Sequence, residues 1–259
     1  MPTVLGVDYS HWQNPPNTNY PPDVRQMQAA GMQFVIIKAW EADNPDPNFK
    51  ENWANAEADN MPRLAYVWLH ESDSDARRNA CFNFLGDNIP IMLDWEQEGV
   101  SNVTVEHWMD AIEKRYGRDG AIYYGLYPPD TPTARIGQWL RVFPEYCTQS
   151  QLKLPPWDGD ANPDWRNCWA IWQSTEKANI DGIDGLNDLD QLAPCITIED
   201  FVAWLDNGEP LPAAPDTVKP AIRRLQFRLN GAGYEAGQPD GLWGQHTQSA
   251  INDYSGWDG

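Results

Sequence analysis

The sequence predicts an α/β protein built on a parallel sheet or barrel. Short apolar runs that close on a charged residue alternate with segments of helical length over most of the first 205 residues. Alternation of strands with helices is typical of parallel α/β folds. A chain of 259 residues can bury a sizeable core, either as one large domain or as a large and a small one.

The predicted elements follow one another in a regular order. Strands are predicted at residues 4–7, 34–37, 64–69, 89–93, 121–124 and 169–173, and helices at 24–30, 48–60, 74–85, 105–116 and 199–205. Gly31 is expected to end the first helix, since glycine suits the conformation that follows a helix. Residues 136–142 are predicted to form a weak helix or a loop, and residues 146–164 lack helical periodicity. A barrel whose last segments lose their helices fits this pattern.

A Pro/Ala-rich stretch, residues 207–216, is predicted to link a large domain, 1–206, to a small one, 217–259. The formal net charge is −20, and nearly all of it precedes Asp216, so the two parts differ in composition. The small part has apolar residues at helical spacing, among them Ile222, Leu225 and Leu229. We expect a compact helical module with a limited core.

Composition and motifs exclude several classes of function. The net charge of −20 makes nucleic acid a poor partner. No apolar run reaches transmembrane length, and the first residues lack the basic and apolar regions of a signal peptide, so we expect no membrane partner and synthesis in a cytoplasm. The four cysteines are far apart without a CxxC pair, and the four histidines show no metal-ligand spacing. No metal site and no cofactor are therefore predicted.

Acidic residues close several of the predicted strands. The apolar run from residue 89 ends in Asp94 and Glu96, and residues two apart on a strand point to the same side, roughly 7 Å apart. The carboxyl ends of strands are where α/β barrels carry their chemistry. Asp8 and Glu41 also follow strands, and residues 181–190 form an acidic run.

Clustered carboxylates and 31 aromatic residues suit glycoside hydrolysis. One carboxylic acid protonates the leaving oxygen, while another carboxylate stabilises the positive charge that develops on the sugar. Two other interpretations stay open on these grounds alone. Oxygen ligands could bind Ca²⁺ or Mg²⁺, and the acidic residues could form a solvated rim.

Five segments resemble glycoside hydrolase family 25, the Chalaropsis-type lysozymes or N-acetylmuramidases. They are GVDYSHWQ at 6–13, VIIKAWE at 35–41, DPNF at 46–49, LDWE at 93–96, and WQ at 172–173 followed by GIDG at 182–185 and DLD at 188–190. The resemblance covers residues 4–205. It implies a flattened TIM-like barrel, with about five βα units followed by strands with few helices.

The resemblance also implies roles for individual residues. Glu96 would be the general acid and Asp94 its partner, with Asp8 and Asp188 at the other two acidic positions of the site. Asp190 stands where asparagine is usual, so it ranks behind Asp188. The residues expected to bind substrate in the groove are Tyr66, Tyr123, Trp172, Gln173, Lys38 and Glu41.

Two departures from the family pattern affect the expected substrate subsites. Trp40 stands where a small polar residue is common, and Val67 stands where a histidine often follows the tyrosine.

The small C-terminal part resembles the three-helix peptidoglycan-binding module. The likeness rests on LQFRL at 225–229, GY at 233–234, DGLWG at 240–244 and TQSAI at 247–251. Asp240 and Gly241 are predicted to form a turn, and Thr247 is expected to cap the last helix.

A muramidase joined to a wall-binding module is similar to the endolysins of bacteriophages. The resemblance implies a monomer that cleaves the β-1,4 bond between N-acetylmuramic acid and N-acetylglucosamine in bacterial peptidoglycan. It would stay in the host cytoplasm until lysis and then act on the cell wall. The alternatives are a catalytically inactive glycan-binding protein and a glycosidase that acts on a related polymer such as chitin.

Overall fold

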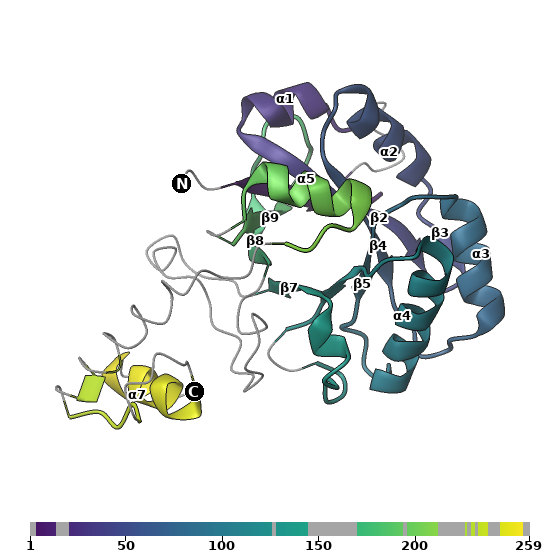
Figure 1. Ribbon diagram of the computed structural model, residues 1–259. Helices are drawn as coiled ribbons and strands as arrows, with labels where there is room; N and C mark the ends of the chain where they lie inside the picture. The colour runs from purple at the N-terminus through teal and green to yellow at the C-terminus, as the bar shows by residue number, and fades with distance from the viewer. Residues whose placement is uncertain are drawn as a thin grey trace. The chain divides into compact units, whose positions relative to one another are not determined.

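The computed structural model of the chain is shown in Figure 1. The structure describes residues 4–13, 21–125, 128–144, 170–193, 196–211, 226, 229–230, 233–237 and 244–255. The described residues up to 211 belong to one compact unit, and those from 226 onward belong to another.

The first unit is a closed barrel of eight strands. They are β1 (Leu5–Tyr9), β2 (Met32–Glu41), β4 (Arg63–Trp68), β5 (Ile91–Asp94), β6 (Ala121–Tyr123), β7 (Leu140–Pro144), β8 (Ile171–Ala178) and β9 (Asn187–Leu192). Seven strands are parallel, while β9 runs antiparallel to both of its neighbours, β8 and β1. Pairing of β1 with β2 closes the ring, and the short β3 (Asn44–Pro45) pairs with the end of β2. The predicted α/β barrel is confirmed.

Helices lie around the outside of the strands (Figure 1). Those that follow β1, β2, β4 and β5 are α1 (Val24–Ala29), α2 (Phe49–Ala58), α3 (Asp75–Leu85) and α4 (Asn102–Tyr116). The next connection holds only a 3₁₀ helix, η1 (Ile136–Gln138). The side chain of Ser101 accepts from the backbone N–H of Thr104 at the start of α4, and Gly117 ends that helix in the left-handed conformation. Within the described ranges, no helix is both long and apolar enough to cross a membrane.

Two strands differ from the sequence prediction. β7 occupies residues 140–144, where a weak helix or loop was predicted, and β9 occupies residues 187–192, where no strand was predicted. Both lack the uniform apolar run that marks the earlier strands. β9 carries Asp188 and Asp190 on one face, so its inward side is acidic in place of the usual apolar residues.

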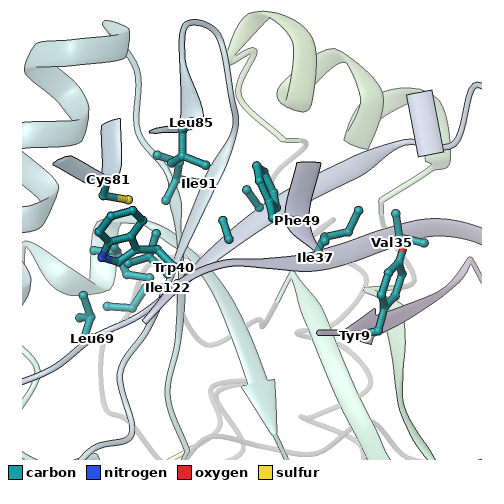
Figure 2. Packing of buried hydrophobic residues seen from close by; sticks show 14 of the residues in the cluster. Tyr9, Val35, Ile37, Trp40, Phe49, Leu69, Cys81, Leu85, Ile91 and Ile122 are labelled. Carbon is teal, nitrogen blue, oxygen red and sulfur yellow. The ribbon is translucent and has the colours of Figure 1, made fainter. Parts of the chain in front are cut away.

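A hydrophobic layer fills the space between the barrel and its helices (Figure 2). Trp40 of β2 lies in this layer with Cys81 of α3 and Ile122 of β6. The register of β2 against β4 shifts between Lys38 and Trp40, and this irregularity turns the indole toward the helices. Trp40 is 5% exposed and its Nε1 donates to the carbonyl of Ala42 at 2.8 Å. The unusual tryptophan therefore fills the core and does not face the inside of the barrel.

The last helix of the first unit is α5 (Ile198–Asn207). It begins with a capping box, in which Thr197 and Asp200 exchange side-chain and backbone hydrogen bonds, and it ends at Gly208. Its Phe201 meets the ring of Phe34, near the start of β2, edge-on at 5.1 Å. α5 thus packs at the end of the barrel opposite to the strand ends that carry the carboxylates.

The second unit has a small core around α7 (Gln245–Ser255). The buried members of this core are Leu229, Ala236 and Ala250. Thr247 was expected to cap this helix, but the structure places it inside the first turn. Its buried hydroxyl accepts from Gln226 Nε2 at 3.0 Å and donates to the carbonyl of Ala236 at 3.3 Å. Residues 240–241, where a turn was predicted, lie outside the described residues.

Candidate active site

One set of polar and aromatic side chains shares the inner face of the barrel, where the parallel strands end. Val7, Tyr9 and Ile37 pack in the layer under the helices, so the residues that alternate with them point inward. Residues paired directly across neighbouring strands point to the same side of the sheet, so the inward residues of one strand identify those of the next. The inward set is Asp8 of β1, Lys38 of β2, Tyr66 and Trp68 of β4, Asp94 of β5, Tyr123 of β6, Gln173 of β8, and Asp188 and Asp190 of β9.

Residues predicted from distant parts of the sequence therefore meet in one place. Asp8 pairs directly with Asp188 across β1 and β9. Asp94 pairs with Tyr123 on one side and with Trp68 on the other. Trp68 was missed at the sequence level, although its position two residues after Tyr66 on the same strand could have predicted it.

Hydrogen bonds from its backbone and its side chain fix the position of Trp95, which stands between Asp94 and Glu96. Its backbone N–H donates to the carbonyl of Tyr123 at 2.9 Å, one residue beyond the end of β5. Its side chain is fully buried, and Nε1 donates to the carbonyl of Val100 at 2.9 Å. Because Trp95 points into the hydrophobic layer, alternation directs Asp94 to the inner side. Glu96 lies two residues beyond the end of β5, close enough for its charge to raise the pKa values of Asp94 and Asp188. Asp94 is buried and Glu96 is exposed.

Burial and like charge raise the pKa of the innermost carboxyl groups. The pKa of Asp8 lies well above its ordinary value because the group is desolvated, and because Asp188, Asp190 and Asp94 are nearby. The pKa of Asp94 is also well above its ordinary value, first through desolvation and then through Glu96. The positive charge of Lys38 lowers both pKa values and so opposes these effects.

The outer carboxyl groups shift in the same direction. Desolvation raises the pKa of Glu96, and Lys38 opposes this rise. Desolvation, with the charges of Glu176 and Glu96, raises the pKa of Asp188 to about 6. The site can thus hold protons close to neutral pH, as a general acid requires.

Lys38 is a buried cation among these acids. It is 5% exposed, and its Nζ donates to Glu41 Oε2 at 2.5 Å. The same ammonium lies 5.1 Å from the centre of the Trp68 ring and 5.9 Å from that of Tyr66. These contacts hold the positive charge where it favours the ionised forms of its acidic neighbours.

Tyr123 and Gln173 line the inner face together, because the hydroxyl of Tyr123 donates to Gln173 Oε1 at 2.9 Å. Trp172 does not join them. It is 1% exposed, and it precedes Gln173 on β8, so its side chain lies on the opposite face of the strand. This placement does not fit the groove-lining position predicted for Trp172.

Hydrogen bonds join the turn after β1 to the segment after β3. Asp46 Oδ2 accepts from the backbone N–H of His11 at 3.1 Å and lies 2.7 Å from His11 Nδ1. Trp12, at the tip of this turn, is 74% exposed.

This end of the barrel can protonate a leaving group and stabilise a developing cation. Glu96, whose pKa is raised by desolvation, stands at the exposed side, and the buried acids Asp94 and Asp8 belong to the inward set. Within the described ranges, no group of three or more His, Cys, Asp or Glu side chains is arranged to hold a metal ion.

Comparisons with known proteins agree with this fold. A model of "Glycosyl hydrolases family 25" matches residues 7–183. The uncharacterized protein YegX of Escherichia coli strain CFT073 is 27% identical over 222 residues, covering 81% of this chain and 76% of that protein. Lysozyme M1 of Streptomyces globisporus is 27% identical over 204 residues, covering 70% and 65%. The crystal structure of a bacterial lysozyme from Streptomyces coelicolor shares the fold, with a TM-score of 0.59 at 21% identity, and covers 81% of this chain and 100% of that one.

Proposed function

The chain belongs to glycosyl hydrolase family 25, and on that basis we propose that it is an N-acetylmuramidase. It would hydrolyse the β-1,4 bond between N-acetylmuramic acid and N-acetylglucosamine in peptidoglycan. The observation that carries the proposal is that Asp94 at the end of β5 and Glu96 two residues beyond it flank a buried Trp95, with the charge of Glu96 close enough to raise the pKa of Asp94. The name of the relative Lysozyme M1 supports the same class of substrate.

Glu96 is the proposed general acid. It is exposed, so a glycan at the barrel end can reach it, and its raised pKa keeps a proton available. Transfer of this proton to the glycosidic oxygen breaks the C–O bond, and the leaving sugar departs as an alcohol. A water molecule then adds to the sugar carbon, and Glu96 regains a proton in the course of the cycle.

Asp94 is the proposed partner of Glu96. It is 6% exposed, and in its ionised form it would stabilise the positive charge at the anomeric carbon or assist the acetamido group of the substrate. Desolvation and Glu96 raise the pKa of Asp94, and Lys38 opposes this rise and so favours the ionised form. The negative charge of Asp188, whose pKa is raised only to about 6, adds at pH 7 to the field that favours a cationic transition state.

Glu96→Gln tests the assignment of the acid. We expect the variant to lose at least about 100-fold in the rate at which purified cell walls clear, because general acid catalysis contributes about that much or more. Glu98→Gln is the matched control, since it changes an exposed glutamate two residues away. Lysis by Glu96→Gln at a rate close to that of the control would contradict the assignment.

The new reducing ends identify the bond. Muramic acid at the reducing end supports the proposal, whereas glucosamine there contradicts it. Binding to walls with no release of sugar would instead indicate an inactive glycan-binding protein, and cleavage of chitin in preference to walls would indicate the related glycosidase.

We further propose that residues 217–259 bind the cell wall and that the whole chain acts as a phage endolysin. The likeness of this segment to peptidoglycan-binding modules supports the proposal, as does the small buried core around α7. As an endolysin, the protein would act as a monomer and without a cofactor. It would remain in the host cytoplasm until lysis and then reach the peptidoglycan.

A further inference from the structure

Two exposed apolar side chains lie close in sequence to the acidic residues of β1 and β9. Large hydrophobic residues that are exposed in the described part of the chain are Trp12 at 74%, Leu186 at 59% and Val103 at 54%. Trp12 lies four residues after Asp8, and Leu186 lies two residues before Asp188. Single exposed apolar residues are common on protein surfaces, so the position of this pair matters more than its exposure.

The pairing of β1 with β9 brings Trp12 and Leu186 to the same end of the barrel. Asp8 pairs with Asp188, and the two strands are antiparallel. The chain therefore leaves β1 toward Trp12 at the end where it enters β9 from Leu186. This is also the end at which Asp94 and Glu96 stand, because β1 and β5 are both parallel to the strands between them.

Trp12 is presented by an ordered turn. Its backbone N–H donates to Ser10 Oγ at 3.2 Å, and the side chain of Gln13 accepts from Ser10 N at 2.9 Å and from Ser10 Oγ at 3.1 Å. The ring of His11 lies 4.5 Å from the ring of Trp12, and Asp46 fixes His11. The indole is thus held outward at little further cost in conformational entropy on binding.

We propose that Trp12 is a sugar-binding platform, assisted by Leu186, for a pyranose ring of the glycan next to the cleaved bond. The C–H face of a pyranose is apolar and flat enough to stack on an indole, while its hydroxyl groups remain free to bind the polar residues of the inward set. A sugar ring on Trp12 would extend the substrate contacts to the β1–β9 side of the acidic site. This inference rests on the proposed function.

The binding test uses Glu96→Gln as the parent, so that the glycan is not consumed. Calorimetry with a soluble tetrasaccharide of alternating N-acetylglucosamine and N-acetylmuramic acid gives the affinity. We expect Trp12→Ala in this background to weaken binding about tenfold or more, and Leu186→Ala to weaken it by a smaller factor. Trp12→Phe should restore most of the affinity, since a flat ring remains.

Val103→Ala is the matched control because it removes an exposed apolar side chain from α4. It should bind as the parent does.

In the otherwise intact enzyme, Trp12→Ala should raise KM for the tetrasaccharide with kcat within about twofold. Equal binding by Trp12→Ala and the parent, or equal losses in Trp12→Ala and Val103→Ala, would overturn the platform. Weaker binding by Trp12→Ala than by the parent, without hydrolysis by the intact enzyme, would contradict the proposed function and still support the platform.

Discussion

Asp190 is a fully buried carboxyl group that accepts no hydrogen bond in the described part of the chain. Neither of its oxygens has a partner, and its side chain faces Gln173 and Gly6 across the neighbouring strands. Burial raises its pKa well above the ordinary value of 3.8, and the charge of Asp188 raises it further. The folded state therefore favours the neutral form of this carboxyl group.

Asp190→Asn should stabilise the protein at neutral pH. The folded pKa is raised, so the wild type loses stability as pH rises above 3.8 toward the folded pKa. The variant has no proton to lose there. We expect its free energy of unfolding at pH 7 to be higher by about 1 kcal/mol or more, because each unit by which the folded pKa exceeds the unfolded pKa is worth about 1.4 kcal/mol. Urea unfolding between pH 5 and pH 8 measures both the gain in the free energy of unfolding and its change with pH.

The exposed Asp184 provides a control, since Asp184→Asn should change the free energy of unfolding at pH 7 by no more than about 0.5 kcal/mol. If the free energy of unfolding of Asp190→Asn changed with pH as steeply as that of the wild type, Asp190 would not be the cause of the pH dependence.

At the scale of elements, the contact between β5 and β6 depends on Gly120. A Cβ at this position would lie 2.5 Å from the carbonyl oxygen of Ile91 and 2.8 Å from the ring of Trp139. The backbone oxygen cannot move aside without disturbing the pairing of Met92 with Ala121, the first pair of the ladder that ends with Asp94 and Tyr123. The missing side chain of Gly120 thus allows the two strands to approach at their starting ends.

Gly120→Ala should lower the free energy of unfolding by about 1–3 kcal/mol, as expected of overpacking, and should also slow wall hydrolysis. Gly125→Ala is the control, because a Cβ there meets only Pro144 Cγ at 3.7 Å. Chemical denaturation and turbidity assays compare the two. Equal free energies of unfolding for Gly120→Ala and Gly125→Ala would contradict the overpacking expected at Gly120.

The elements that could be predicted are those whose sequence is either a continuous apolar run or a series of apolar residues at helical spacing. Strands up to β6 are apolar runs, so the carboxylates at their ends, Asp8 and Asp94, could be placed before the fold was known. β9 could not be predicted because its inner face is acidic. The outward turn of Trp40 could not be predicted either, since a strand irregularity such as the one after Lys38 has no fixed sequence pattern.

At the scale of the molecule, the barrel needs no residue beyond 211 to close. Its ring is complete with β9, and α5 ends before the boundary between the two units. The composition of residues 207–216 suggests this boundary from the sequence. The hydrogen bonds of Thr247, by contrast, depend on the partners Gln226 and Ala236, so only the structure could reveal them.

A protein shortened to residues 1–211 should therefore keep its chemistry and lose its attachment to walls. We expect hydrolysis of the soluble tetrasaccharide within about twofold of the full chain, and wall binding weaker by about tenfold because the second binding site is lost. Sedimentation with purified walls measures the binding. Undiminished binding by the shortened protein would contradict the proposed role of residues 217–259.

The pairing of Asp8 with Asp188 has a consequence for folding order. These residues are neighbours in the barrel but lie 180 positions apart in the chain, at the seam where its first and last strands join. Such distant pairing is slow to form because a long stretch of chain must first be ordered. During synthesis the seam cannot close until β9 has left the ribosome. The acidic centre is thus assembled late, and a nascent chain that lacks β9 has no complete hydrolytic site.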